Sequence, residues 1–196
     1  MSHSMTMKIW QGKYDIDDVW EIVHRPENDD KRFELLDGQL FEFPLAGFQH
    51  GVLAAQMGFH LFDANERLSL GLVTARCGYH PPNDRWTLFG PSAAFTRKER
   101  VQYPLAKKYA ARMPDIAVEI ASFCNPLDWT HRKLPKYLKN GSQLVWLVIP
   151  DSESVEVCRL DANGEIQSEV IDVEGSLSGE GVLPGFELEL TKLFAS

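Results

Sequence analysis

The chain has 196 residues, 44% of them hydrophobic and 24% charged, with a formal net charge of −8. This composition excludes a disordered or fibrous protein and suffices for one sizeable apolar core, so a single domain is expected over residues 1–196. The net negative charge comes from residues 151–196, which hold 11 acids and 2 bases. Residues 1–150 hold 17 acids and 18 bases and are close to neutral overall. A polyanionic partner is therefore not excluded for the larger part of the chain.

Neither a membrane segment nor a secretion signal is evident. No run approaches the roughly 18 consecutive apolar residues of a membrane span, and the N-terminus lacks the charged-then-apolar layout of a secretory signal. The three cysteines, Cys77, Cys124 and Cys158, lie far apart and without a C-x-x-C spacing. Reduced thiols in a reducing compartment fit this spacing best, so we expect a cytoplasmic protein without membrane association.

The first predicted elements are a short helix and a hairpin. Residues 15–24 pair early acidic residues with apolar ones at helical spacing, which predicts an amphipathic helix. In RFELLDGQLFEF, residues 32–43, two runs of strand-forming residues flank Asp37 and Gly38. This dipeptide is preferred in two-residue turns, so the segment predicts a β-hairpin.

A long helix and three strands are predicted next. Apolar residues recur at helical offsets from Phe48 to about Leu68, as in a helix that packs on a sheet. The following region is rich in β-branched and aromatic residues and is interrupted by proline and glycine. It predicts strands near 71–78, 86–89 and 92–96.

Residues 96–113 predict a basic loop or short-helix excursion between strands. The segment contains six basic residues with two tyrosines between them. Basic side chains contact phosphates and tyrosine stacks on exposed bases, although a solvated surface is the more common role of such a segment. The candidate nucleic-acid contacts are Arg97, Lys98, Arg100, Lys107 and Lys108.

A strand over 115–121, a helix from about 129 to 140 and a strand over 144–149 follow, and short strands complete the chain. A strand, helix and strand in this order form a parallel pair if both strands join one sheet. Pro135 lies inside the predicted helix, where proline removes a backbone hydrogen bond. We expect either a kink or a helix that begins later.

Glu119 is a carboxylate inside an otherwise apolar strand. Because strand side chains alternate, Glu119 shares a face with Asp115 and Ala117. A buried carboxylate needs a partner, and Lys133 or a metal ion are the candidates; a purely structural ion pair remains the alternative. By spacing alone Lys133 belongs to a solvated face, because other basic residues surround it.

Several segments, taken together in order, resemble the bacterial restriction-endonuclease-like (Uma-type) family of the PD-(D/E)XK nuclease superfamily. They are RFELLDGQLFEF with Glu34, GFQHGVL with His50, PSAAF at 91–95, PDIAVEI with Glu119, the Lys-x-x-x-Tyr of Lys133 and Tyr137, and the ending SLSGEGVLPGFELEL. The resemblance extends over roughly residues 15–195. It implies an α/β (α+β) fold with a restriction-endonuclease-like core: a mixed central β-sheet flanked by helices, with an extra N-terminal hairpin and C-terminal strands.

The resemblance also implies a catalytic site of Glu34, Ser92, Glu119 and Lys133. Glu34 and Glu119 would be ligands of Mg²⁺ or Mn²⁺, Lys133 would stabilise developing charge, and His50 is a possible additional site residue. Without the resemblance, Glu34 could equally be an exposed strand residue or a capping residue. His50 would then more commonly be a helix cap or a solvent-exposed residue.

One motif departs from the family pattern. Where the family has Pro-Asp, this chain has Pro91 and Ser92. A serine hydroxyl is neutral and is a poor magnesium ligand, so metal binding should be weakened and could be absent. Asp115 is four residues from Glu119, about 13 Å along a strand, which is too far to share the ion.

Three functional hypotheses follow. The first is a metal-dependent DNA endonuclease, acting as a homodimer, whose site is impaired by Ser92. The second is a catalytically inactive pseudo-nuclease that binds nucleic acid or a protein partner. The third is a small-molecule or RNA substrate at the same site.

Overall fold

A computed structural model describes residues 7–195 of the chain. Its helices and strands, in chain order, are β1 Lys8–Ile9, α1 Ile16–Val23, β2 Lys31–Leu36, β3 Gln39–Pro44, α2 Phe48–Leu68, β4 Gly71–Ala75, β5 Ala93–Arg97, β6 Ile116–Ile120, α3 Leu127–Lys139, β7 Leu144–Ile149, β8 Ser154–Leu160, β9 Ile166–Ile171, β10 Ser176–Ser178, β11 Glu187–Glu189 and α4 Leu190–Phe194.

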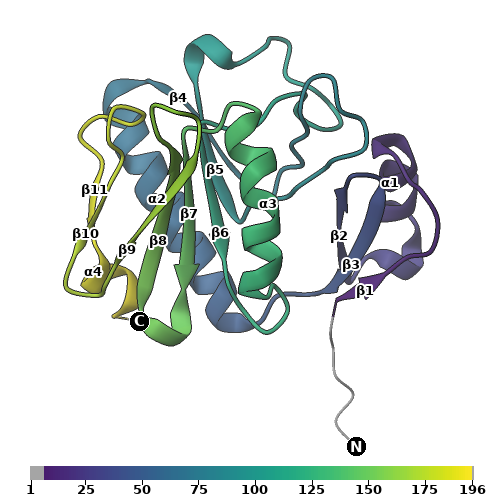
Figure 1. Cartoon of the computed structure of the whole chain (residues 1–196), viewed down its shortest axis with the longest axis horizontal. Coiled ribbons are helices and arrows are strands. Elements are labelled where there is room, and N and C mark those ends of the chain that lie inside the picture. The colour runs from purple at the N-terminus through teal and green to yellow at the C-terminus, as the bar shows by residue number, and fades with distance from the viewer. Residues whose placement is uncertain (1–6, 196) are drawn as a thin grey trace, which may run out of the picture.

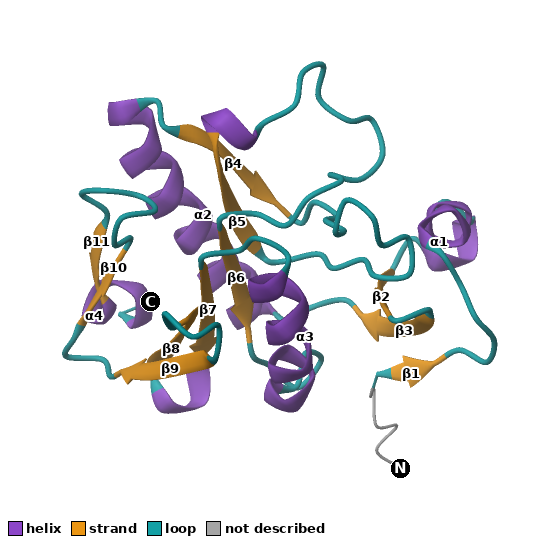
Figure 2. Ribbon diagram, turned by 45° about the horizontal axis from the view of Figure 1, so that its top comes forward, coloured by secondary structure: helices purple, strands orange, loops and turns teal. Residues whose placement is uncertain are grey.

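A mixed six-stranded sheet forms the centre of the molecule, in the order β4-β5-β6-β7-β8-β9. Strands β6 and β7 are parallel and α3 connects them, as the strand–helix–strand order predicts. The other neighbouring pairs in this sheet are antiparallel. Figures 1 and 2 show α3 over one face of the sheet and α2 over the other. The predicted fold class is therefore confirmed.

The alternation of side chains along β6 separates two apolar cores. Ile116, Val118 and Ile120 pack in the core on the α2 face. Ala117 packs in a second core with α3 and the hairpin. Glu119 has the parity of Ala117, so its carboxylate faces α3. The side-chain alternation of β6 thus decides which helix supplies a partner for the Glu119 carboxylate.

The N-terminal hairpin forms as predicted and belongs to a separate three-stranded sheet in the order β1-β3-β2. Asp37 and Gly38 both have positive φ, 52° and 84°, as the two central residues of a type I′ turn require. Helix α1 packs on this sheet through Val19 and Ile22, which are buried. The hairpin lies beside α3 in the second core, and this position brings β2 to the central sheet.

The C-terminal elements cover the α2 face of the sheet. Strands β10 and β11 pair with each other, and α4 follows directly. Their buried side chains join the core of that face: Leu177, Val182, Leu183, Phe186, Leu188, Leu190 and Leu193. The aromatic ring of Phe186 stacks on Trp146 of β7.

Three predicted boundaries were wrong. The strand expected over 71–78 ends at Ala75, because Arg76 adopts a left-handed conformation with φ 51°. Residues 86–89 form isolated bridges with Leu35 and Tyr79 rather than a strand. Helix α3 begins at residue 127, earlier than predicted, and includes Pro135 in its interior. Packing of the amphipathic helix against the sheet outweighs the local cost of proline.

Within residues 7–195, none of the helices combines the length and apolar character needed to cross a bilayer.

Candidate active site

The site lies where β2, the ends of β5 and β6, and α3 meet. Glu34 comes from β2, Glu119 from β6 and Lys133 from α3, and none of the three side chains has more than 1% of its surface exposed. The structure thus brings together three of the four residues that the family resemblance singled out. It does so through tertiary packing, since Glu34 and Lys133 are 99 residues apart in sequence.

Lys133 binds both carboxylates. Its Nζ donates to Glu119 Oε1 at 2.6 Å and to the two oxygens of Glu34 at 3.1 Å. The expectation of a solvated Lys133, drawn from the surrounding charges, was wrong. The sequence did contain the correct signal, because Trp129, Lys133 and Tyr137 recur every four residues on the buried face of α3.

Further donors surround the two carboxylates. Glu34 accepts from the Trp129 indole at 2.6 Å, from Arg32 at 3.3 Å and from the Gly90 backbone N–H at 3.2 Å. Burial alone would raise the pKa of Glu34, but the charges of Lys133 and Arg32 and these hydrogen bonds together lower it below its usual value. Glu34 is therefore held as a carboxylate.

Glu119 is bound less completely. Its Oε1 also accepts from the Tyr137 hydroxyl at 2.7 Å, while its buried Oε2 has no hydrogen-bond partner among the described residues. Burial raises the pKa of Tyr137 well above its usual value, and the neighbouring carboxylates raise it further. Tyr137 consequently stays a neutral donor.

Ser92 lies at the end of the β5–β6 ladder. Its backbone N–H donates to the Val118 carbonyl at 2.8 Å, and Ala93 pairs with Val118 in the antiparallel register. Ser92 and Ala93 therefore both lie opposite Val118, as in a β-bulge, and Glu119 lies one residue further along β6.

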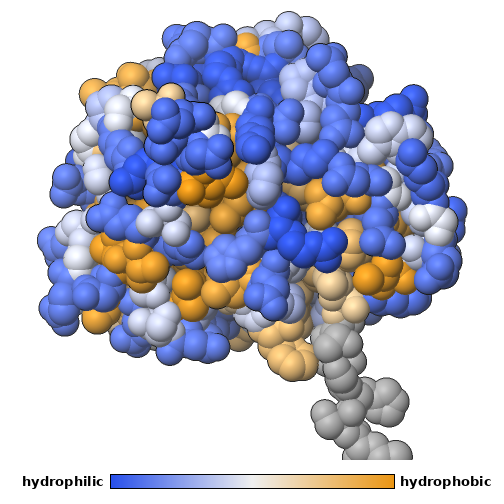
Figure 3. All heavy atoms as spheres, viewed as in Figure 1, coloured by the Kyte–Doolittle hydropathy of each residue, from blue (hydrophilic) through white to orange (hydrophobic). Residues whose placement is uncertain are grey.

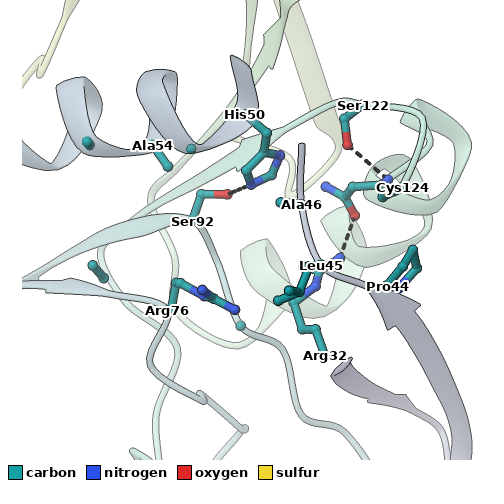
Figure 4. Close-up of a pocket in the computed structure, with 15 residues that line it drawn as sticks. Arg32, Pro44, Leu45, Ala46, His50, Ala54, Arg76, Ser92, Ser122 and Cys124 are labelled. Carbon is teal, nitrogen blue, oxygen red and sulfur yellow. Dashed lines mark hydrogen bonds between the residues drawn. The ribbon is translucent and has the colours of Figure 1, made fainter. Parts of the chain in front are cut away.

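The Ser92 side chain is paired with His50 at the start of α2. Ser92 Oγ lies 3.2 Å from His50 Nε2, and Figure 4 shows the contact. Burial lowers the pKa of His50 to about 4, and the charges of Arg32, Arg76 and Lys133 act in the same direction. His50 is thus neutral at neutral pH, and its role as a site residue stays a prediction.

A pocket of about 380 Å³ opens over Ser92 and His50. Its polar lining includes five further side chains: Arg32, Arg76, Ser122, Cys124 and Asn125. Glu34, Glu119 and Lys133 do not line it, so the buried ion network lies beneath its floor. Arg32 links the pocket lining to the buried ion network, because it donates to Asn125 Oδ1 in the lining and to Glu34 in the network.

The donors at this site fit a divalent ion poorly as they are arranged. Magnesium takes close to six oxygen ligands at about 2.1 Å, several of them from carboxylates, phosphates or water. Both Glu34 oxygens and Glu119 Oε1 already accept hydrogen bonds, which leaves Glu119 Oε2. Among residues 7–195 no group of three or more His, Cys, Asp or Glu side chains is placed to hold a metal.

The basic segment lies at the other end of β5. Arg97 ends that strand five residues from Ser92, about 17 Å away. Arg97 and Arg100 both pair with the buried Asp115 at 2.9 Å. Lys98, Lys107 and Lys108 are exposed, and Figure 3 shows strongly hydrophilic residues over this part of the molecule. A nucleic-acid contact here stays a prediction.

Sequence reasoning missed two residues of the pocket, Arg32 and Arg76. Arg32 precedes Glu34 by two positions, and this spacing puts both side chains on one strand face. That was a usable signal. For Arg76 the sequence offers none, since its position depends on the left-handed turn that ends β4.

Comparisons with known proteins identify the family and a solved structure of similar fold. The profile of the Uma2 family, described as "Putative restriction endonuclease", matches residues 19–191. A crystal structure from Anabaena variabilis, described as that of a putative nuclease belonging to DUF820, has a similar fold with a TM-score of 0.76 at 18% sequence identity. The similarity covers 93% of this chain and 98% of that one. No curated protein matches the chain. The chain belongs to the Uma2 family of restriction-endonuclease-like proteins.

Proposed function

We propose that this protein binds nucleic acid on a nuclease fold without cleaving it by metal-dependent chemistry. One observation carries the proposal. Lys133 binds both site carboxylates inside the protein, and serine stands at position 92, where the family motif has an acid.

The formal charges around the site support this function. Glu34 and Glu119 supply two negative charges, whereas Arg32, Arg76 and Lys133 supply three positive ones, and His50 is neutral. The excess is one positive charge. It opposes the approach of a dication and favours a phosphate group, because charges in a concave, weakly hydrated site are poorly screened.

Metal-dependent cleavage is the second candidate, and the unpartnered Glu119 Oε2 favours it. In that reading Glu34 and Glu119 hold Mg²⁺ or Mn²⁺, Lys133 stabilises the developing charge, and Ser92 contributes through a water molecule. The substrate is DNA, and a homodimer would reach both strands. Metal binding in this second candidate requires that Lys133 lose part of its hydrogen bonds to Glu34 and Glu119.

The substitution Ser92→Asp separates the two functions, and Ser92→Asn is its neutral, equally sized control. We expect the wild type to bind labelled single-stranded DNA or RNA in EDTA and to leave plasmid and single-stranded DNA intact with magnesium or manganese. Ser92→Asp should acquire manganese binding, measured by titration calorimetry, and metal-dependent cleavage. Ser92→Asn should acquire neither.

Two outcomes would overturn the proposal. Metal-dependent cleavage by the wild type that is lost in Glu119→Ala and Lys133→Ala would establish the second candidate instead. Failure of the wild type to bind any nucleic acid would remove the binding function.

A further inference from the structure

The pocket over Ser92 has a cationic wall with no acid in it. Arg32 and Arg76 line it, whereas its remaining lining consists of neutral polar residues, alanine, glycine, proline and leucine. Figure 4 shows Arg76 and Arg32 on different sides of the pocket. A guanidinium group is a planar fork that matches the oxygens of a phosphate, so this wall is suited to an anion.

Arg76 is free to bind a ligand. Within residues 7–195 it takes part in no ion pair or hydrogen bond, and its side chain is exposed. Its backbone is held at φ 51°, in the left-handed region that is unfavourable for a residue with a side chain. The fold thus keeps an unpaired guanidinium over the pocket in a backbone conformation that is locally unfavourable.

Arg32 is held in place rather than free. Its guanidinium packs on the Phe43 ring at 4.5 Å, and its nitrogens bond Glu34 and Asn125. About a fifth of the side chain, 21%, remains exposed. A guanidinium that is fixed before the ligand arrives loses less entropy on binding than a mobile one.

Two exposed phenylalanines lie close in sequence to residues that line the pocket. Phe48 is 90% exposed and lies two residues before the lining residue His50. Phe123 is 71% exposed and lies between the lining residues Ser122 and Cys124. Aromatic rings beside a cationic groove are the arrangement on which unpaired bases stack, whereas bases in a duplex are not available for it.

We propose that this pocket binds a phosphate group of single-stranded nucleic acid without a metal ion, between Arg32 and Arg76, while neighbouring bases stack on Phe48 and Phe123. The pocket volume of about 380 Å³ lies in the roughly 300–1,000 Å³ range of ligand pockets and exceeds the size of a bare phosphate. The choice of nucleic acid as ligand rests on the function proposed above. The anion preference rests on the pocket itself.

The test measures the affinity for a short fluorescent oligothymidylate in EDTA by fluorescence anisotropy. Arg76→Gln should weaken binding about tenfold or more and make it less sensitive to salt, because one charge-assisted contact is lost. Phe123→Ala should weaken it by about fivefold or more through lost stacking. The same sequence as a duplex should bind more weakly to the wild type.

Matched controls lie elsewhere on α2. Arg67→Gln removes an exposed arginine that pairs with Asp63, 17 residues and about 25 Å along the helix from His50. Phe59→Ala removes an exposed phenylalanine from the same helix. Both should bind the oligonucleotide as the wild type does, because neither lines the pocket.

Inorganic phosphate tests anion binding at the arginines separately from base stacking on the phenylalanines. In a thermal shift assay it should stabilise the wild type and Phe123→Ala equally and Arg76→Gln less. An oligonucleotide that binds Arg76→Gln and Phe123→Ala with wild-type affinity would overturn this inference and leave the proposed function in place. A wild type that binds no nucleic acid, yet shows the Arg76-dependent phosphate shift, would overturn the nucleic-acid function and retain the anion pocket alone.

Discussion

Lys133 is the residue on which the buried charges of the site depend. Its ammonium group lies between Glu34 and Glu119, and all three side chains are inaccessible to water. Removing a charged group from water costs several kcal/mol, so such groups are stable only when paired and hydrogen-bonded. The network therefore stabilises the fold only while all its members are present.

Substitution of Lys133 by methionine should lower the free energy of unfolding by about 3–5 kcal/mol, because two buried carboxylates lose their cation. Urea denaturation measures this loss. Lys139→Met, at an exposed position of the same helix, is the control and should change stability little. Adding Glu119→Gln to Lys133→Met should restore part of the loss; an unchanged double variant would contradict a coupled network.

His50 should make stability depend on pH. Burial, reinforced by Arg32, Arg76 and Lys133, lowers its pKa from 6.5 to about 4. Between these values the unfolded chain binds a proton that the folded chain does not, so the free energy of unfolding falls as pH decreases from 6.5 to about 4. Urea midpoints across this window should fall less steeply for His50→Gln than for the wild type.

The matched control for this pH experiment is His24→Gln, which removes an exposed imidazole from α1. It should keep the slope of the wild type. Equal slopes for the wild type and His50→Gln would show that His50 is not held neutral by its surroundings.

At the scale of elements, α3 explains how a proline and a buried lysine share one helix. The buried side chains of α3 recur at helical spacing on one face, and Pro135 lies on the exposed face. Pro135 has no N–H for the His131 carbonyl one turn earlier. The apolar contacts of the buried face keep the helix continuous over 13 residues despite that loss.

Pro135→Ala should therefore raise the free energy of unfolding, by about 1–3 kcal/mol. Alanine restores the missing hydrogen bond and favours helix, although the gain is reduced because proline also restricts the unfolded chain. Urea denaturation gives the value, with Lys139→Ala as the control on the same exposed face. A loss of stability would mean that the proline ring makes a contact on which α3 depends.

At the scale of the whole molecule, the central sheet separates two apolar cores, and the buried charges lie on its α3 side. The C-terminal β10, β11 and α4 seal the α2 face with buried apolar side chains. The hairpin and α3 seal the other face and bring in the charges. The C-terminal segment is acidic as a whole, yet the side chains it buries are apolar, so its charge is carried on the surface.

Phe186→Ala should cost about 3–5 kcal/mol of stability, because the ring is buried and stacks on Trp146. Val170→Ala, at a position that is 64% exposed, is the control and should cost little. In urea-free buffer the folded Phe186→Ala variant should bind nucleic acid like the wild type. A specific loss of binding would indicate that the two faces of the sheet are coupled.

The sequence by itself determined the elements with strong local signals and the identity of the family. The Asp37–Gly38 turn, the helix over residues 48–68 and the strand–helix–strand unit around Glu119 were all predicted, because turn chemistry and hydrophobic periodicity are local properties. Boundaries failed where a long-range effect decided them. The bridge at Leu88 depends on β2, and the start of α3 depends on packing.

Only the tertiary structure decided how the site residues are used. The sequence indicated that Glu119 needs a partner, and it left open whether Lys133 or a metal ion would supply it. The fold buries Lys133 between two carboxylates, pairs Ser92 with His50 and places Arg32 and Arg76 in the lining of the pocket. The physical reason is that the strength of a charge pair depends on the distance between the charges and on their burial. Both quantities are set by strand register and helix packing between residues about 100 positions apart in the chain.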